Sequence, residues 1–414
     1  MPRTFPPGFR WGVATSGHQT EGGNTGSDTW FLEHVRPTAF REPSGLACHG
    51  YQLWREDVDL VAGLGLDAYR FSVEWARVEP AEGEFSAEAL AHYRAIADRC
   101  VAAGIAPVVT YNHFTAPHWF ARRGGWLGPE APALFARYCG MVTEALGDGT
   151  AWVVTMNEPN LPRLLSWLGI PAGAREMERA MLLAAGEQAG VPRYRVANVV
   201  LPEEMDAMAA GMAAGHRAAR EAIKSRRADL PVGLSLAIVD DQVVGDDPSV
   251  RDRKRAEVYG MWLDLARDDD FVGVQNYERA RYSGSGPVPP PEGAVLNQLG
   301  SSDIYPLSLA GAVRYAHAAA GVPVFVTEHG LGHRDDTLRA AMIGPALAGL
   351  LDVIEDGVPV LGYLHWSLLD NFEWVFGFDV RFGLHEVDRA TFTRKPKPSA
   401  AVYSAIARAN GGSL

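Results

Sequence analysis

Short apolar runs alternate with longer amphipathic stretches along the whole chain. Eight runs rich in apolar and β-branched residues predict strands, at residues 9–14, 68–72, 107–111, 152–157, 232–237, 271–275, 323–327 and 361–365. Between them, apolar residues at helical spacing predict helices, which include residues 54–64, 87–103, 204–228, 304–320 and 337–355. Gly65, Gly104, Gly321 and Gly357 follow four of these segments, where a helix C-cap often requires glycine.

This alternation predicts a parallel sheet covered by helices, because strands buried on both faces are almost continuously apolar. Eight strand–helix units fit a single (β/α)8 barrel, or TIM barrel, of about 250 residues, which loop insertions can extend beyond about 400. The surplus length predicts long loops after the strands, at residues 15–51, 160–202 and 283–293. We therefore expect one catalytic α/β barrel domain over residues 1–414, with a two-domain division as the alternative.

Composition and net charge limit the kinds of molecule that the chain can bind. Of 414 residues, 47% are hydrophobic, which suffices for a large core, and 38 Lys and Arg against 50 Asp and Glu give a net charge of −12. This charge excludes a basic surface for nucleic acid or anionic lipid, so we expect no membrane partner and a neutral small-molecule substrate. The sequence leaves open whether the chain forms a homo-oligomer.

Cysteine usage and the N-terminal residues indicate a compartment. Cys48, Cys100 and Cys139 lack metal-ligand spacing and are typical of free, buried thiols in a reducing environment. The first ten residues contain no apolar signal segment, and no run of 18 apolar residues occurs in the chain. We therefore expect a cytoplasmic protein.

Two of the predicted strands end in a glutamate. The run at 152–157 leads into Glu158, which Pro159 follows, and the run at 323–327 leads into Glu328. A carboxylate at the end of an apolar strand is costly to bury unless it is paired or used, and a single one is more often a paired structural residue. Two of them are what cleavage of a glycosidic bond requires, one as an acid and the other as a nucleophile.

Other predicted strands also end in polar residues. In a (β/α)8 barrel the carboxyl ends of all strands meet at one mouth, where reactive groups lie. The polar residues in or just after these strands are Gln19, Arg70, His113, Asn157, Gln275, Tyr277 and His365. We therefore expect a polar site at this mouth.

With these motifs, the chain resembles glycoside hydrolase family 1, the retaining enzymes of β-glucosidase type, over about residues 9–399. The matching segments are residues 9–15 with Gln19, 69–75, 157–159, 327–330 and 366–374. The resemblance implies a TIM barrel without cofactor or metal. It also implies hydrolysis of a terminal nonreducing β-D-glycosyl residue, a glucoside or else a galactoside or fucoside, through a covalent glycosyl-enzyme intermediate.

Site residues follow from the resemblance by position. It implies Glu158 as general acid/base and Glu328 as nucleophile, with Arg70 and Tyr277 positioning Glu328. Tyr277 is placed by reading residues 273–277 without a gap, so that Gln275 stands where the family has Asn. The implied substrate-binding residues are Gln19, His113, Asn157, Trp366, Glu373 and Trp374, with Trp366 as the floor under the sugar ring. A cis peptide between Trp366 and Ser367 is also implied.

Electrostatics supports the two different roles. Glu328, near Arg70 and the Tyr277 hydroxyl, should remain ionised, and its charge together with burial should raise the pKa of Glu158. Retention requires the two carboxyl groups to lie about 5–5.5 Å apart, and adjacent mouths of the fourth and seventh strands, across a narrow barrel, can supply that separation. Glu373 would repel a phosphate, which disfavours 6-phosphoglycosides.

Four alternatives remain at this point. Residues 63–68 resemble a dinucleotide-binding motif, but they stand between a helix and a strand, the reverse of the required order. Glu328, His329, His333 and Asp335 suggest a metal hydrolase, although intervening glycines favour a loop. The other two alternatives are a member of the family that binds sugar without catalytic activity and a glycosyl-transferring enzyme of natural-product metabolism. The latter stays open because residues 160–202 depart from the continuation usual in the family.

Overall fold

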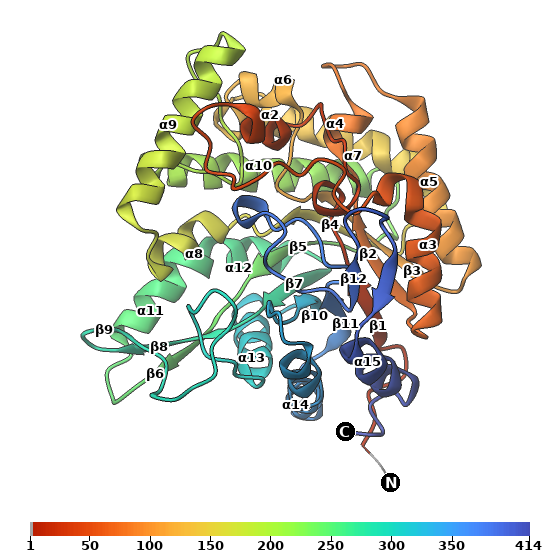
Figure 1. Ribbon diagram of the computed structural model, residues 1–414, viewed down its shortest axis with the longest axis vertical. Coiled ribbons are helices and arrows are strands. Elements are labelled where there is room, and N and C mark those ends of the chain that lie inside the picture. The colour runs from red at the N-terminus through yellow and green to blue at the C-terminus, as the bar shows by residue number, and fades with distance from the viewer. Residues whose placement is uncertain (1–2) are drawn as a thin grey trace.

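Eight parallel strands close into a barrel in the computed structural model, which describes residues 3–414 (Figure 1). These strands are β1 (Arg10–Ala14), β2 (Ala68–Ser72), β3 (Ala106–Asn112), β4 (Trp152–Asn157), β5 (Val232–Ala237), β7 (Phe271–Asn276), β10 (Val324–His329) and β11 (Val360–Trp366). They follow one another around the barrel in chain order, and β11 pairs with β1 to close it. The predicted fold class is confirmed, and each predicted strand lies within two residues of its observed ends.

Helices between the strands form the outer layer. The longer ones are α3 (Gly50–Gly63), α5 (Ala87–Ala102), α7 (Ala131–Leu146), α10 (Met205–Lys224), α13 (Ser308–Ala320), α14 (Asp336–Glu355) and α15 (Pro398–Arg408). The five predicted helices all form, with ends that differ by up to four residues. The four predicted C-cap glycines have φ angles between +74° and +94°, a left-handed region that glycine adopts without steric cost.

Helix α14 is long and apolar enough to cross a membrane by length and composition, but half of that apolar window is buried within the protein. It packs between α13 and α15 on the outside of the barrel. Its apolar character is therefore accounted for by packing against the neighbouring elements.

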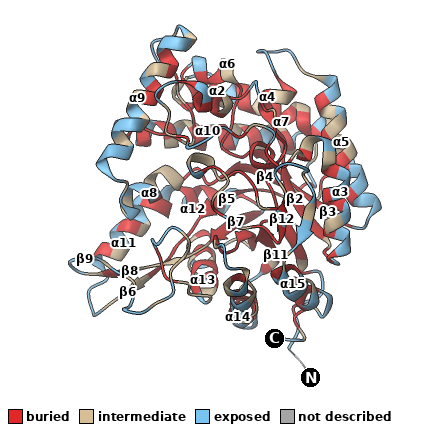
Figure 2. Cartoon of the chain, viewed as in Figure 1, coloured by how far each residue is buried: buried red, intermediate tan, exposed pale blue. Residues whose placement is uncertain are grey.

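The interior of the barrel is filled by side chains. A buried cluster contributed by the strands consists of Ala14, Ala68, Val108, Val154, Phe271, Phe325, Leu364 and Trp366. Figure 2 shows the barrel strands as buried and the outer helix faces as the main exposed surface. Because the interior is packed, the barrel itself can hold a ligand at the mouth formed by the carboxyl ends of the strands but not in its centre.

Several predicted loops contain regular structure. Residues 160–202, predicted only as a loop, contain α8 (Leu161–Leu168) and α9 (Ala172–Ala189). The chain after β5 and β7 forms a small sheet of β6 (Asp240–Val243), β8 (Arg279–Ser283) and β9 (Gly286–Val288). Shorter elements complete the fold: α1 (Gly17–Thr20), α2 (Asp28–His34), α4 (Trp75–Val78), α6 (His118–Arg122), α11 (Ser249–Arg255), α12 (Met261–Leu265), β12 (His385–Val387) and β13 (Arg394–Pro396).

Helix α8 was missed because it is short and has helix-breaking residues at both ends. Pro162 lies in its first turn, where a missing N–H is tolerated, and Gly169 ends it with a φ of +89°. Figure 1 places α8 and α9 beside the barrel, with the β6–β8–β9 sheet close to α8 and α11. Of these insertions, α8 adds a wall to the cavity at the mouth of the barrel.

Candidate active site

The mouth of the barrel holds a cavity of about 250 Å³. Nine of the ten predicted site residues line it: Gln19, His113, Asn157, Glu158, Tyr277, Glu328, Trp366, Glu373 and Trp374. The tenth, Arg70, is fully buried on β2 and contacts both Asn157 and Glu328. The structure therefore brings all ten residues together.

Backbone irregularities aim the two glutamates. The pairing of β4 with β5 shifts register between Val154 and Asn157, and Glu158 then adopts a φ of +46°. Its amide donates a hydrogen bond to the Ser235 carbonyl at 2.8 Å, which holds this left-handed conformation. A similar shift between β10 and β7 comes directly before Glu328. Such bulges redirect side chains at the ends of barrel strands, and unusual φ angles concentrate at functional sites.

The Glu328 carboxylate is bonded on both oxygens. Its Oε1 accepts from the Arg70 guanidinium and from Gln275 Nε2 at 3.0 Å. Its Oε2 accepts from the Tyr277 hydroxyl at 2.5 Å. Three donors, one each from β2, from β7 and from the residue directly after β7, thus fix the orientation of one carboxylate.

The two glutamates differ in proton affinity. Burial and then the charge of Glu328 raise the pKa of Glu158 well above its usual range. Burial also raises the pKa of Glu328, but Arg70 and the Tyr277 hydroxyl offset part of this rise. Among residues 3–414 no side chain is hydrogen-bonded to the Glu158 carboxyl. We conclude that Glu158 holds the proton of this pair and that Glu328 is the anion.

The two glutamates come from strands that are not neighbours in the sheet. In the barrel order, β5 and β7 lie between β4 and β10, so the glutamates reach the cavity from strands that do not pair. They approach each other because both side chains point into the same cavity. The separation of about 5–5.5 Å that retention requires stays a prediction.

One part of the cavity lining is polar and aromatic. Gln19 Nε2 donates to Glu373 Oε2 at 3.2 Å, and burial followed by the charge of Glu328 raises the pKa of Glu373 to about 8. His113 stacks on Trp366 with ring centroids 5.8 Å apart and planes at 14°. Burial lowers the pKa of His113 well below 6.5, so its imidazole is neutral. The peptide between Trp366 and Ser367 is cis, as expected. Hydrogen-bonding groups beside flat rings suit a neutral sugar.

Gln275 was expected at the mouth of the barrel, but the sequence assigned it no role in the site. Its amide donates to Asn157 Oδ1 at 2.7 Å as well as to Glu328. Arg70 Nη2 also donates to Asn157 Oδ1, at 2.5 Å, so that the Asn157 amide nitrogen remains for other partners. The signal for Gln275 was its place on β7, two residues before Tyr277.

Apolar residues on one side of the cavity were also missed. Helix α8 contributes Leu161, Leu164, Leu165 and Leu168 to the lining. Their spacing of three, four and seven residues marks one face of a helix, and this signal was present within residues 160–202.

The structure gives the two competing motifs other roles. In the segment that resembles a dinucleotide-binding motif, α3 ends at Gly63 and β2 begins at Ala68. No helix N-terminus, which would bind the phosphates, therefore follows its glycines. His329 Nδ1 lies 2.8 Å from the Tyr363 hydroxyl in the barrel wall, and His333 Nδ1 accepts from the Asp335 amide at 2.9 Å. Each histidine thus already has a hydrogen-bond partner.

Comparison with known proteins gives consistent results. A family model described as glycosyl hydrolase family 1 matches residues 1–184 and 295–412. The crystal structure of β-glycosidase BGL167 has a TM-score of 0.90 to this chain at 47% identity, covering 98% of this chain and 97% of that one. Beta-glucosidase A of Acetivibrio thermocellus is 28% identical, with 99% of both chains covered. A bifunctional beta-D-glucosidase/beta-D-fucosidase of Bifidobacterium breve is 31% identical, with 97% of this chain and 98% of that protein covered.

Proposed function

The chain belongs to glycosyl hydrolase family 1 and is a retaining β-glycosidase, and from this premise we propose which of its residues carry the reaction. Glu158 is the general acid and base, and Glu328 is the nucleophile. The observation that supports this assignment is the unequal bonding of the two carboxyl groups. Glu328 accepts three hydrogen bonds that favour its anion, whereas Glu158 is buried and holds the proton.

In the first step a Glu328 oxygen attacks C1 of the sugar while Glu158 donates its proton to the glycosidic oxygen. The bond between C1 and that oxygen breaks, the aglycone leaves as an alcohol, and an ester joins Glu328 to C1. This esterification removes the charge of Glu328, which lowers the pKa of Glu158. In the second step Glu158 accepts a proton from water, the water oxygen attacks C1, and Glu328 leaves as a carboxylate. Two inversions give net retention.

We propose that the sugar is a neutral β-D-glucosyl residue, with galactosyl or fucosyl as relaxed alternatives. Gln19, Glu373 and neutral His113 offer donors and acceptors for hydroxyl groups beside the rings of Trp366 and Trp374. The names of the relatives from Acetivibrio thermocellus and Bifidobacterium breve support a glucoside and a fucoside, respectively. A phosphate would be repelled by the Glu328 anion and would lie beside the carboxyl groups of Glu158 and Glu373.

Proton NMR of the products tests this proposal. A screen of aryl β-glycosides identifies the sugar released, and the first anomer formed is then observed before mutarotation. We expect the β-anomer first, because two displacements at C1 restore the starting configuration. An α-anomer formed first would contradict the nucleophile assignment. The same reaction with an added alcohol measures how much sugar passes to an acceptor other than water.

Tyr277→Phe is expected to lower kcat/KM about ten- to a hundred-fold, because one charge-assisted hydrogen bond to the Glu328 carboxylate is lost. Burial and the charge of Glu328 keep the pKa of Tyr277 well above 10, so its hydroxyl remains a donor. Without this donor the pKa of Glu328 rises. When the pH is lowered, Glu328 then becomes protonated, and therefore inactive, at a higher pH than in the wild-type enzyme. The acid limb of the kcat/KM profile should therefore move to higher pH.

A matched control is Tyr111→Phe on β3, whose buried hydroxyl lies 3.1 Å from Thr143 Oγ1 and outside the cavity lining. We expect its acid limb to coincide with that of the wild-type enzyme. A loss of activity in Tyr277→Phe without movement of the limb would show that the tyrosine only supports the fold.

We also propose a cytoplasmic location. Cys48, Cys100 and Cys139 are free and buried, as thiols in reducing compartments commonly are. Fractionation of the native cells, followed by an activity assay of each fraction, tests this location. Activity found mainly in the secreted fraction would contradict it. Whether the enzyme forms a homo-oligomer stays open.

A further inference from the structure

One side of the active-site cavity is apolar. Away from the polar sugar-binding residues, its lining includes Leu161, Leu164, Leu165, Leu168, Leu299 and Phe382, together with one carboxyl group, that of Glu278. Three of these are unusually open for leucine, since Leu165, Leu168 and Leu299 are 37%, 43% and 52% exposed. Exposed apolar side chains that gather around one opening mark a binding surface.

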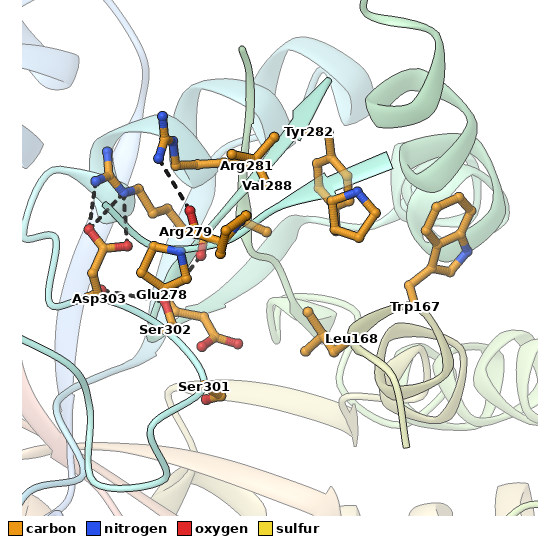
Figure 3. A pocket seen from close by; sticks show the side chains of 14 residues that line it. Trp167, Leu168, Glu278, Arg279, Arg281, Tyr282, Val288, Ser301, Ser302 and Asp303 are labelled. Carbon is orange, nitrogen blue, oxygen red and sulfur yellow. Dashed lines mark hydrogen bonds and ion pairs between the residues drawn. The ribbon is translucent and has the colours of Figure 1, made fainter. Parts of the chain in front are cut away.

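A second cavity of about 360 Å³ adjoins the first one, because Leu168 and Glu278 line both. Its walls come from α8 on one side and from β8 and β9 on the other (Figure 3). Its lining includes Trp167, Tyr282 and Val288, together with three prolines at positions 287, 289 and 290. The two cavities therefore extend from the polar pocket along α8.

The walls of this second cavity are held in place by contacts outside it. Trp167 Nε1 donates to the Glu257 carboxylate at 2.9 Å, and the Trp167 ring lies edge-on to Tyr282 with centroids 6.5 Å apart. The Arg253 guanidinium lies over the Trp167 ring, 5.4 Å from its centroid. Because these aromatic groups are already anchored, little conformational entropy is lost when a ligand packs against them.

Charges in the second cavity are balanced. Arg279 forms a paired set of hydrogen bonds with Asp303, the shortest at 2.5 Å. Glu278 and Arg281 remain, one of each sign. Figure 3 shows the Glu278 side chain extending toward Leu168. An ionic ligand would meet a like charge as well as an opposite one, so that this cavity favours neither anions nor cations.

The apolar wall is joined directly to the proposed acid. The Leu161 amide donates to the Glu158 carbonyl at 2.9 Å, so that α8 begins three residues after the carboxyl that would protonate the leaving oxygen. An aglycone whose oxygen lies at Glu158 has its body next to the leucines of α8. The apolar surface therefore lies on the leaving-group side of the scissile bond, where it contacts the aglycone and not the sugar.

We propose that the aglycone is a bulky uncharged alcohol with a largely hydrocarbon body, which lies along α8 and extends toward Trp167 and Tyr282. This inference rests on the proposed function, since it assumes that Glu158 protonates the leaving group. A second sugar is a poorer fit, because the leucines offer no partner for its hydroxyl groups, whose desolvation is costly.

Kinetic comparison of octyl and methyl β-D-glucoside tests the proposal, because these two leaving alcohols have similar acidity and differ mainly in hydrocarbon length. We expect kcat/KM to be at least about 100-fold higher for the octyl compound, since each methylene that becomes buried contributes about four-fold. It should also exceed kcat/KM for cellobiose, whose leaving group is a sugar. An octyl-to-methyl ratio near one, or a preference for cellobiose, would overturn the proposal.

A double variant locates the effect. Leu165→Ser with Leu168→Ser should reduce the octyl-to-methyl ratio at least about ten-fold, because two apolar contacts of the aglycone are removed. Leu183→Ser is the matched control, since Leu183 is a 64% exposed leucine on α9 outside both cavity linings. We expect the wild-type ratio in this control, and an unchanged ratio in the double variant would contradict the location.

Binding measurements separate this inference from the catalytic one. Titration calorimetry with octyl and methyl β-D-thioglucoside compares the two aglycones without requiring turnover. Tighter binding of the octyl compound, reduced in the double variant, supports the apolar aglycone site even if the catalytic assignment fails. Equal affinities would overturn it even if both glucosides are hydrolysed.

Discussion

Glu328→Gly is expected to reduce kcat by about 10⁵-fold or more, because the variant lacks the group that forms the glycosyl-enzyme ester. The nucleophile is held by donors from Arg70, Gln275 and Tyr277, and none of these can attack C1 in its place. Michaelis kinetics with an aryl β-glucoside measures the loss. Full activity of this variant would refute the assignment.

Azide should restore part of the lost activity. Removal of the side chain leaves space beside C1 on the face opposite the leaving group, and a small anion can occupy it. Attack by azide inverts C1 once, so that the product is an α-glycosyl azide that NMR can identify. Glu328→Gln is the matched control, because its amide fills the space. We expect this control to be equally inactive and to remain so when azide is added.

The barrel was predictable from the sequence because its strands are buried on both faces. Such strands read as continuous apolar runs, and the polar residue at the end of each run marks the mouth. Glu158, Glu328 and Asn157 could therefore be assigned to one site before their distances were known. The roles of the surrounding residues depended on motifs rather than on periodicity.

Features that depend on contacts between distant segments were not predictable. Gln275 is one of two polar residues that end β7, and only the barrel shows that its amide reaches both Asn157 and Glu328. The left-handed φ of Glu158 accompanies a register shift between β4 and β5, and the sequence around Glu158 gives no sign of this shift. The relative placement of β4 and β10 follows from closure of the whole barrel.

The apolar aglycone wall was hidden for a different reason. Helix α8 has only eight residues, and its leucines are interrupted by Pro162 and followed by Gly169, residues that usually indicate a loop. The second cavity also needs β8 and β9, which come more than 100 residues later in the chain. A site built from segments so far apart appears only when the fold brings them together.

Glu158→Gln is expected to separate substrates by the acidity of their leaving groups. For an alkyl or phenyl glucoside, kcat should fall about 10²- to 10⁴-fold, which is the usual contribution of a general acid. For a dinitrophenyl glucoside the first step should change little, because its phenolate leaves without a proton. Kinetics across a series of substituted aryl β-glucosides measures this dependence. Equal losses for good and poor leaving groups would contradict the acid role.

The pH profile gives a second readout for the same variant. The wild-type enzyme needs the protonated form of Glu158, so that its activity is lost as the pH rises through a pKa that burial and the charge of Glu328 have raised. Glutamine does not titrate, and the basic limb should disappear from kcat/KM in Glu158→Gln. Glu373→Gln is the matched control, because it removes a neighbouring buried carboxyl. If only Glu158 protonates the leaving oxygen, this control weakens all aryl glucosides to a similar degree and retains the basic limb.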